Sequence, residues 1–552
     1  MAAAVDRISD LPDDLIQRIL HFAPAREAAS TGVLSSRWRS TGAVNLAVLV
    51  RRRDDFFSLR DAFVRSAHAA LAAAGGGHVR RLTIHVETER LPVQLTADAF
   101  LHRDAEDWEG RRHDVVAGVV SHPAARRVEE LRVAAVRSAD GPSSDGEVTE
   151  MEEGEFRLSL GTQPSTETLR VLDLTGCGGV SLPAGAALPR LTTLRLRLCV
   201  VQVEDLQGVV DSAPALATVH LESVFLAGTK EDGCYCARLR FPAATALVLA
   251  KCRGHGSHHN GDDDASDCEG AMEIDAPRLR SFKYAGLPRR FTLISPAAGM
   301  ERADLHFLHD DGPHHYRDTT SVLRARFWRF LHNFRGVKSL KLKVTYLKEI
   351  AVAGNGNGIL PPLHGVERLD VAALHDPASE TSTVAIANLL RCCPNLRDLV
   401  LRLSTVPPDS TKNGGYCRDV LRRRWQADLG ESVRRLARQR GWPKPPPSPP
   451  STKISCMNQS LDNAGDIHGL SGRSFACLRS SLTRVGIQFR NDERSWLGVA
   501  LIKFFAENAI CLEEMRIDGG NERMRDHINH RVERWIVESG MRCFRVLPLE
   551  RR

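Results

Sequence analysis

Residues 169–174 read LRVLDL, residues 191–196 read LTTLRL and residues 216–221 read LATVHL. In all three, an apolar residue is followed by two other residues, a second apolar residue, one other residue and a third apolar residue. Side chains alternate between the two faces of a β-strand, so the second and third apolar residues would lie on the same face. The pattern therefore predicts a short strand with one buried face, which the chain enters through a turn at the first apolar residue.

The same three-residue apolar pattern recurs along most of the chain. Further copies are Val79/Leu82/Ile84, Val128/Leu131/Val133, Ala244/Leu247/Leu249, Leu279/Phe282/Tyr284, Met300/Ala303/Leu305, Val337/Leu340/Leu342, Val366/Leu369/Val371, Leu396/Leu399/Leu401, Leu482/Val485/Ile487 and Leu512/Met515/Ile517. From Leu169, the next copies follow after 22, 25 and 28 residues, close to the period of a leucine-rich repeat. A chain that is 42% apolar contains single copies by chance, whereas thirteen copies predict a repeat array. We expect Leu172, Leu194 and Leu340 to be buried strand residues of this array.

The segments between the copies predict the second layer of the array. Residues 203–212 and 381–392 have the spacing of amphipathic helices and would cover its convex side. Several copies are preceded by a proline, as in residues 213–216 (APAL). Proline suits a turn before a strand because it donates no hydrogen bond to a sheet. The intervals are irregular, so loops of different lengths must leave the array.

Length, charge and cysteine usage exclude several classes of protein. A chain of 552 residues is too long for one compact core and predicts about three or four domains or a repeat array. No apolar run approaches the length of a membrane-spanning helix, and the first ten residues lack the apolar core of a signal peptide. The 75 basic and 68 acidic residues leave a net charge of only +7. The thirteen scattered cysteines favour free thiols in a reducing compartment, the cytosol or the nucleus.

Low-complexity segments interrupt the array. Residues 140–155 contain acidic residues and neither Lys nor Arg, so we expect this segment to be solvated and mobile. The largest gap between copies, 86 residues from Leu396 to Leu482, contains an arginine-rich segment that is predicted to be helical, residues 418–440. Residues 442–450 (WPKPPPSPP) follow, and a segment this rich in proline predicts an extended, semi-rigid connector.

A separate helical module is predicted before the array, where residues 8–39 read ISDLPDDLIQRILHFAPAREAASTGVLSSRWR. Ser9 or Asp10 can cap a helix, and Pro12 suits its first turn. An apolar stripe with helical spacing follows at Leu15, Ile16, Ile19, Leu20 and Phe22. Pro24 ends this helix, and two shorter helices are predicted after it. A module this small cannot bury enough surface alone, so it either caps the array or completes its core on a partner.

These strings resemble the F-box of plant proteins. The matching segments are residues 6–9 (DRIS), 11–13 (LPD), 15–16 (LI), 19–20 (IL), 22 (F), 24 (P), 33–35 (VLS) and 37–39 (RWR). Ala23 departs from the leucine that the family usually has at that position. The dense LPDDL and VLSSRWR strings favour an F-box over a simple helical cap. An F-box followed by a leucine-rich array is the architecture of the F-box/leucine-rich-repeat proteins of plants.

The resemblance implies a substrate receptor that catalyses no reaction itself. F-box proteins bind a Skp-type adaptor, which attaches them to a cullin scaffold that carries a RING protein and a ubiquitin-conjugating enzyme. The residues that match the family's adaptor-binding positions are Leu11, Pro12, Leu15, Ile19, Leu20, Pro24, Val33 and Leu34. By analogy, the concave face of the array would bind a protein substrate, whose identity cannot be deduced from the sequence. The alternative is a leucine-rich-repeat scaffold without a link to ubiquitin ligation.

No cofactor, metal site or catalytic residue is predicted. Residues 252–268 are rich in Cys, His and Asp, but their spacing lacks the paired CxxC arrangement of a structural zinc site. The glycine runs lack the Lys-Ser/Thr pair of a phosphate loop, and neither a G-x-S-x-G nor an H-E-x-x-H motif occurs. The arginine runs at residues 422–424 and 434–438 lack stacking aromatic residues and have acidic neighbours, which disfavours nucleic-acid binding.

The predicted fold class is α/β, with a short N-terminal helical F-box module followed by an irregular leucine-rich-repeat solenoid. The predicted organisation is an F-box at residues 6–45, connecting helices and first repeats at 46–135, an acidic loop at 136–158, the main array at 159–403, an arginine-rich helix with a proline-rich linker at 404–475, and C-terminal repeats at 476–552. The predicted partners are a Skp-type adaptor, through it a cullin and a RING protein, and a protein substrate, with no membrane.

Overall fold

The chain divides into two units. The computed structural model describes residues 42–51, 56–73, 79–89, 100–101, 115–138, 156–159, 165–182, 185–231, 234–254, 271–295, 299–308, 319–353, 358–375, 381–405, 467, 469–489, 497–518 and 544–548. Unit 1 comprises residues 1–310 and 329–337, and unit 2 comprises residues 311–328 and 338–552. The chain changes unit after residues 310, 328 and 337, and the second of these points lies within helix α8 (Thr319–His332).

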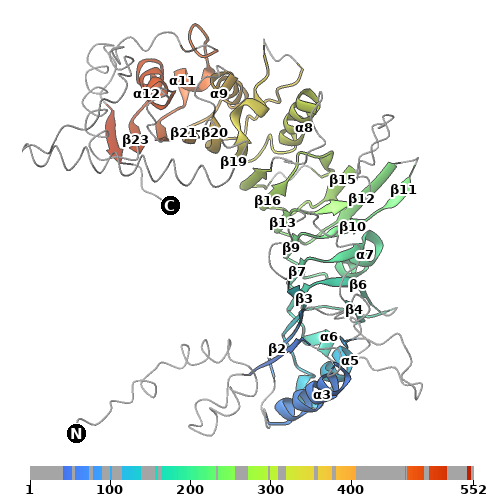
Figure 1. Ribbon diagram of the computed structural model, residues 1–552. Coiled ribbons are helices and arrows are strands. Elements are labelled where there is room, and N and C mark those ends of the chain that lie inside the picture. The colour runs from blue at the N-terminus through green and yellow to red at the C-terminus, as the bar shows by residue number, and fades with distance from the viewer. Residues whose placement is uncertain are drawn as a thin grey trace, which may run out of the picture. The chain divides into compact units, whose positions relative to one another are not determined.

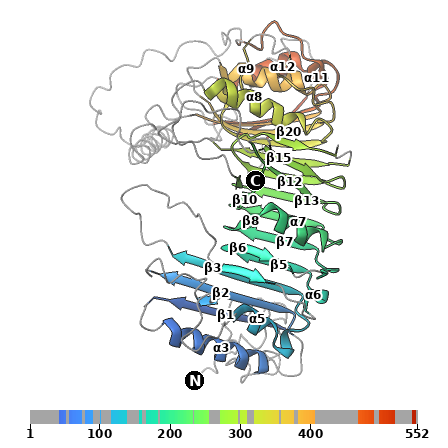
Figure 2. The same ribbon diagram turned by 90° about the vertical axis from the view of Figure 1, so that its right-hand side faces the viewer.

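Unit 1 is built on a sheet of parallel strands that follow one another in chain order (Figures 1 and 2). Its strands are β1 (Ala43–Val50), β2 (Arg81–Glu89), β3 (Glu130–Ser138), β5 (Val171–Thr175), β7 (Thr193–Arg197), β9 (Thr218–Glu222), β13 (Ala246–Ala250), β16 (Ser281–Gly286) and β18 (Arg302–Phe307). Each strand pairs in parallel with the next one in this order. Parallel neighbours need crossover connections, so the rest of the chain must form a second layer.

The strand register places the apolar residues of successive copies side by side. Leu172 pairs with Leu194, Leu194 with Val219, and Val219 with Leu247. Each of these four residues is at most 1% exposed, which confirms the predicted burial of Leu172 and Leu194. Burying one such side chain contributes about 1.5–3 kcal/mol of transfer free energy, and the repetition of the pattern along the sheet makes this the dominant core of unit 1.

Four neighbouring strands of unit 1 end in the same left-handed turn. The residue after the strand has a positive φ at Gly176 (78°), Leu198 (51°), Ser223 (52°) and Lys251 (52°). Each of these residues donates its backbone N–H to a carbonyl of the next strand along, over 2.5–2.9 Å. Only glycine adopts this conformation without strain, and other residues lose about 1–2 kcal/mol. The turn is therefore imposed by the pairing between copies more than by the local sequence.

A buried or half-buried side chain follows each left-handed turn. Cys177, Cys199 and Cys252 stand directly after it in three copies, and Val224 does so in the fourth. The Cys199 thiol donates to the carbonyl of Leu174 over 3.6 Å. Burial raises the pKa of Cys199 and of Cys252 to about 11, so both remain protonated and behave as small apolar residues. These thiols are part of the core and not a reactive site.

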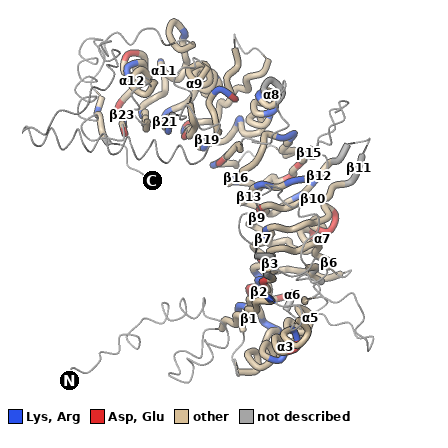
Figure 3. The backbone as a smooth tube through the Cα atoms, in the orientation of Figure 1, with Lys and Arg blue, Asp and Glu red and all other residues tan. Residues whose placement is uncertain are grey.

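Helices cover part of the sheet of unit 1. They are α3 (Phe56–Ala73), α5 (Val115–Val120), α6 (Ser165–Thr168) and α7 (Val203–Asp211), with a 3-10 turn, η2 (Pro123–Ala125). Helix α7 confirms the helix expected at residues 203–212. Glu204 and Asp205 lie in its first turn (Figure 3), where negative charges stabilise a helix because its N-terminal end carries the positive end of the helix dipole. Leu206 and Val209 are buried on this helix.

Strands form much of the second layer in the middle of unit 1. One small parallel sheet consists of β8 (Val200–Gln202), β10 (Phe225–Ala227) and β14 (Arg253–Gly254). A second small sheet is mixed and consists of β11 (Thr229–Glu231), β12 (Cys234–Arg240), β15 (Ala271–Asp275) and β17 (Phe291–Leu293), with β11 antiparallel to β12. In a third, β4 (Phe156–Ser159) pairs with β6 (Cys177–Ser181). Helices were predicted in the second layer at residues 203–212 and 381–392, and no prediction was made for these strand segments. Residues alternate between buried and exposed along β12, as Leu239 and Arg240 do, and this alternation suits a strand.

Unit 2 contains a second run of parallel strands. They are β19 (Ser339–Tyr346), β20 (Arg368–His375), β21 (Asp398–Thr405), β22 (Arg484–Phe489), β23 (Glu514–Asp518) and β24 (Arg545–Pro548). Leu340 is fully buried on β19, as predicted. β21 pairs directly with β22, with Leu399 opposite Val485. The 86-residue gap in the apolar pattern is therefore an insertion between two neighbouring strands.

Helices α9 (Thr381–Cys392), α11 (Ala476–Ser480) and α12 (Leu497–Asn508) also belong to unit 2, together with η3 (Leu347–Ile350). Helix α9 has the predicted bounds. Gly498 allows α12 to lie close to β22, because a Cβ at this position would overlap the ring of Phe489. Asn388 is fully buried on α9, and its amide donates to the carbonyl of Val352 over 3.1 Å.

Several predictions fall outside the described residues. They concern the N-terminal helical module, the acidic segment 140–155, the arginine-rich segment 418–440 and the connector 442–450. In the part of the chain that the structure describes, no helix is long and apolar enough to cross a membrane.

Candidate functional site: the polar face of the parallel sheet

The predicted adaptor-binding residues, Leu11, Pro12, Leu15, Ile19, Leu20, Pro24, Val33 and Leu34, lie outside the described residues. The candidate site that the structure does describe is one face of the sheet in unit 1. Residues between the two buried positions of each strand point to the opposite face. The register lines up Arg132, Asp173, Arg195 and His220 across β3, β5, β7 and β9. Charged residues are thereby brought together from copies that are far apart in the chain.

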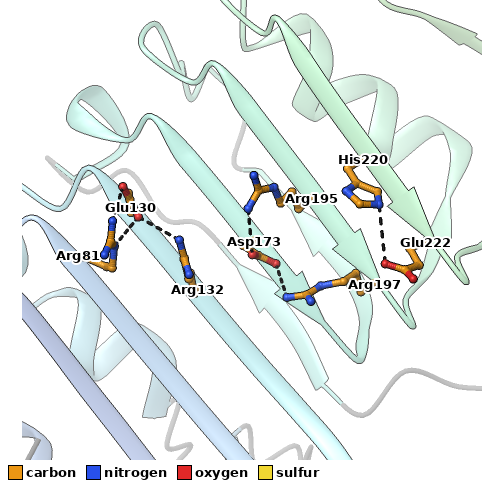
Figure 4. A network of polar contacts seen from close by, with 8 residues as sticks. All are labelled: Arg81, Glu130, Arg132, Asp173, Arg195, Arg197, His220 and Glu222. Atoms are coloured by element: carbon orange, nitrogen blue, oxygen red, sulfur yellow. Dashed lines mark hydrogen bonds and ion pairs between the residues drawn. The ribbon is translucent and has the colours of Figure 1, made fainter. Parts of the chain in front are cut away.

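Glu130 joins two arginines at one end of this face (Figure 4). Arg81 on β2 donates through Nε and Nη2 to the two carboxylate oxygens of Glu130, over 2.5 and 2.9 Å. Arg132 donates a further hydrogen bond over 3.3 Å from within the same strand as Glu130. The hydrogen bond from Arg81 is the main cause that lowers the pKa of Glu130, and burial partly opposes it. The carboxylate is thus ionised near neutral pH and fixes both guanidinium groups.

Asp173 is the most enclosed acid of the face. Only 5% of its side chain is exposed, although it projects from the polar side of β5. Arg197 donates to its Oδ1 over 3.1 Å, and Arg195 Nη1 lies 3.9 Å from its Oδ2. Both arginines remain 44% and 47% exposed, so they cover the acid and still face solvent. Asp173 holds two guanidinium groups side by side on β7, each with N–H groups left for a ligand.

The face continues to His220 and Glu222 on β9, whose Nε2 and Oε2 atoms lie 3.7 Å apart (Figure 4). Burial is the main cause that lowers the pKa of His220, and the neighbouring Glu222 opposes it, so the imidazole is neutral near pH 7. The eight residues of Figure 4 then carry four positive and three negative charges. On β13 the corresponding positions are Ala246, Val248 and Ala250, where the polar network ends.

Unit 2 repeats this arrangement on its own strands. Arg402 on β21 donates to both oxygens of Asp370 on β20, over 3.1 and 3.2 Å. It also donates to Gln488 on β22 over 3.4 Å, and Gln488 in turn donates to Asp518 on β23 over 3.1 Å. Polar contacts thus run across four neighbouring strands of unit 2.

The polar face of unit 1 has the chemistry of a binding surface. Exposed arginines held by buried or half-buried acids present fixed hydrogen-bond donors, which recognise carboxylates and carbonyl groups. Among the described residues, no group of three or more His, Cys, Asp or Glu could hold a metal ion. Of the Cys/His/Asp-rich segment 252–268, only residues 252–254 are described, and Cys252 donates to the carbonyl of Leu221 over 3.4 Å.

The structure and sequence together define a mixed α/β protein with large parallel sheets and an F-box domain. Residues 8–41 match the F-box domain family, within the predicted range of 6–45. The chain therefore carries an F-box domain at its N-terminal end, as the LPDDL and VLSSRWR strings predicted.

Relatives in Arabidopsis thaliana cover most of the chain. A putative F-box/FBD/LRR-repeat protein is 23% identical over 410 residues, 72% of this chain and 77% of the relative. A putative F-box/LRR-repeat protein is 25% identical over 316 residues, 55% of this chain and 58% of the relative. A putative F-box protein is 39% identical over 115 residues, which are 18% of this chain and only 26% of that relative. The chain is thus similar to proteins named for an F-box followed by leucine-rich repeats.

Sequence reasoning did not single out the polar face, although a signal for it exists. Aligning the copies on Leu172 and Leu194 places Asp173 opposite Arg195. Opposite charges at matching positions of consecutive copies were the available clue.

Proposed function

We propose that this protein is the substrate-recognition subunit of a ubiquitin ligase of the Skp–cullin–F-box type. The observation that carries the proposal is the F-box match at residues 8–41. The F-box would bind a Skp-type adaptor through Leu11, Pro12, Leu15, Ile19, Leu20, Pro24, Val33 and Leu34. A cullin and a RING protein would join through the adaptor. The receptor itself makes and breaks no bond, and raises the effective concentration of substrate lysines near activated ubiquitin.

The described sheets would form a leucine-rich-repeat solenoid. Three features favour this architecture: parallel strands in chain order, the apolar pattern on most of these strands, and a Cys or Val three residues after the last apolar residue in four consecutive copies. The last feature corresponds to the Asn/Cys position of the leucine-rich-repeat pattern. We also propose that the protein resides in the cytosol or the nucleus, because the thirteen scattered cysteines favour free thiols and Cys199 and Cys252 form no disulfide.

The polar face of unit 1 would bind the substrate. Arg195 and Arg197 are its most prominent donors, because Asp173 fixes them and about half of each side chain is exposed. Replacing both with glutamate reverses two charges without disturbing a buried apolar residue. Arg253, exposed on β14 in the second layer, provides the control substitution Arg253→Glu.

Two measurements test the proposal separately. First, the Leu11→Ala/Pro12→Ala protein should lose a Skp-type adaptor in a pull-down, while Leu49→Ala, at a 38% exposed position on β1, should retain it. Each lost apolar anchor is worth about 1.5–3 kcal/mol, so the double variant should bind about two to four decades more weakly. Second, proteins captured under proteasome inhibition should be lost from Arg195→Glu/Arg197→Glu and not from Arg253→Glu.

A scaffold without a link to ubiquitin ligation is the alternative, and the match over only residues 8–41 leaves it open. The unmodified protein would then capture partners through the polar face and bind no Skp-type adaptor. Adaptor binding that survives the Leu11→Ala/Pro12→Ala change would instead contradict the proposed docking residues alone.

A further inference from the structure

A cavity of about 270 Å³ opens at the N-terminal ends of four neighbouring strands in unit 2. Its lining residues begin β19, β20, β21 and β22 or stand directly before them: Lys338, Ser339, Glu367, Arg368, Arg397, Asp398 and Arg484. Four of these side chains are cationic and two are anionic, which leaves two positive charges in excess. The cavity is distinct from the polar network of unit 1, because every lining residue belongs to unit 2.

One acid of the cavity is already engaged. Asp398 accepts a hydrogen bond from Arg368 Nε over 3.0 Å, and Arg484 Nη2 lies 3.5 Å from the same oxygen. Its side chain is 16% exposed, whereas Arg368 and Arg484 are 59% and 49% exposed. Each guanidinium has five N–H groups, so both keep donors that can point into the cavity.

The remaining cations, Lys338 and Arg397, are exposed and flank Glu367. In the described part of the chain, no carboxylate lies within ion-pair distance of either cation. Their backbones are nevertheless fixed. The carbonyl of Lys338 accepts the N–H groups of Glu367 and Arg368, over 2.9 and 3.0 Å. Arg397 has the same arrangement with the next strand, so the cations project from rigid positions.

Unit 1 has charged residues at the corresponding positions, but there they form ion pairs with one another. Arg80, Glu129 and Arg170 stand directly before β2, β3 and β5, as Lys338, Glu367 and Arg397 stand before β19, β20 and β21. The Arg80 and Glu129 carbonyls accept paired N–H groups in the same way. In unit 1, however, Glu129 forms ion pairs with both arginines, 4.0 Å from Arg80 and 3.8 Å from Arg170. The cavity in unit 2 exists where the corresponding ion pairs are not made.

We propose that this cavity binds the phosphate group of a phosphomonoester, as a phosphorylated small molecule or as a phosphorylated serine side chain. Two excess positive charges match a phosphomonoester, which carries about −1.5 to −2 at pH 7. Arginine forks and a lysine ammonium are the side chains that bind such oxygens best, and the Ser339 hydroxyl can donate as well. Glu367 is the one uncompensated acid and weakens binding by repulsion. The site does not rest on the proposed receptor role, because binding can be measured without adaptor or substrate.

Titration calorimetry of the full-length protein at constant ionic strength tests the proposal with three probes. They are inorganic phosphate, a capped Ala-phosphoserine-Ala peptide and the same peptide without phosphate. Both phosphate-bearing probes should bind, and the unphosphorylated peptide should not. A phosphopeptide that binds at least about tenfold more tightly than inorganic phosphate identifies a phosphorylated side chain as the ligand. Similar affinities identify a free phosphorylated compound.

Variants decide whether the cavity is responsible. Lys338→Gln/Arg397→Gln should raise the Kd by about tenfold or more, and Glu367→Gln should lower it several-fold, because it removes the opposing charge. Arg80→Gln/Arg170→Gln removes the same number of charges from the matched edge of unit 1 and should leave the Kd unchanged. All of these side chains lie at the surface, and circular dichroism verifies folding. Equal losses in the two double variants, a weaker Glu367→Gln protein or binding of the unphosphorylated peptide would each overturn the proposal.

Discussion

Replacing Leu194 with alanine tests whether the apolar pattern builds the core of unit 1. Leu194 lies on β7 in register between Leu172 and Val219, and only 1% of it is exposed. Truncating a buried leucine costs the transfer free energy of the lost carbons and a further term for the cavity left behind, about 2–5 kcal/mol together. Because folded domains are stable by only about 5–15 kcal/mol, this is a large part of the free energy of unfolding.

Urea unfolding followed by circular dichroism measures this loss. The matched control is Leu198→Ala, four residues further on, because Leu198 is 36% exposed and stands just beyond the end of the same strand. Its truncation should cost less than about 1 kcal/mol. If Leu194→Ala were no more destabilising than Leu198→Ala, then β7 would not bury the predicted face, and the reasoning from the repeated pattern would be refuted.

Two further predictions concern the polar face and the left-handed turns. The pKa of Glu130 is lowered in the folded protein, so its contribution to stability is present above the unfolded value of about 4.3 and is lost as the pH falls through the lower folded value. Urea midpoints measured between neutral pH and pH 3 should therefore fall less steeply for Glu130→Gln than for the unmodified protein, and parallel curves would contradict this. Lys251→Gly should stabilise the protein by up to about 1 kcal/mol, because glycine tolerates a φ of 52°. Lys283→Gly, at an exposed strand position of β16, should instead destabilise it by about 0.5–1 kcal/mol, so thermal melts that shift both variants in the same direction would argue against strain at Lys251.

Two strands of the parallel sheet, β1 and β24, were not predicted because each lacks part of the three-residue apolar pattern. β1 pairs Val44 with Leu82 and Leu46 with Ile84, but the residue three before Val44 is Thr41 and not an apolar residue. β24 pairs Val546 with Met515, but Pro548 occupies the third position. Both strands are held by pairing with a neighbour that carries the full pattern, which a search for the complete pattern cannot detect.

The second layer and the cavity were less predictable for different reasons. Strands β12 and β15 pair with each other because their segments lie above adjacent copies, and such pairing between distant segments is not encoded in local periodicity. The polar face could have been predicted in part, because the apolar register fixes which charges stand opposite each other. The cavity could not, because it depends on whether the side chain of Glu367 reaches Lys338 and Arg397 or points elsewhere.

A single strand register determines both the core and the polar face, and this limits where recognition can vary. Side chains alternate with a period of two, so slipping β7 by one residue would expose Leu194 and bury Arg195. The charged residues of the face also form ion pairs with one another, as Asp173 does with Arg195 and Arg197. Changing one of them therefore affects its neighbours. Residues directly before the strands are anchored by hydrogen bonds of their backbones, which do not depend on the identity of their side chains. In unit 1, Glu129 forms ion pairs with the cations before the two neighbouring strands, whereas in the described part of unit 2 Glu367 forms no such pair and a cavity is present. This edge of the sheet can therefore gain or lose a binding site while the buried core stays unchanged.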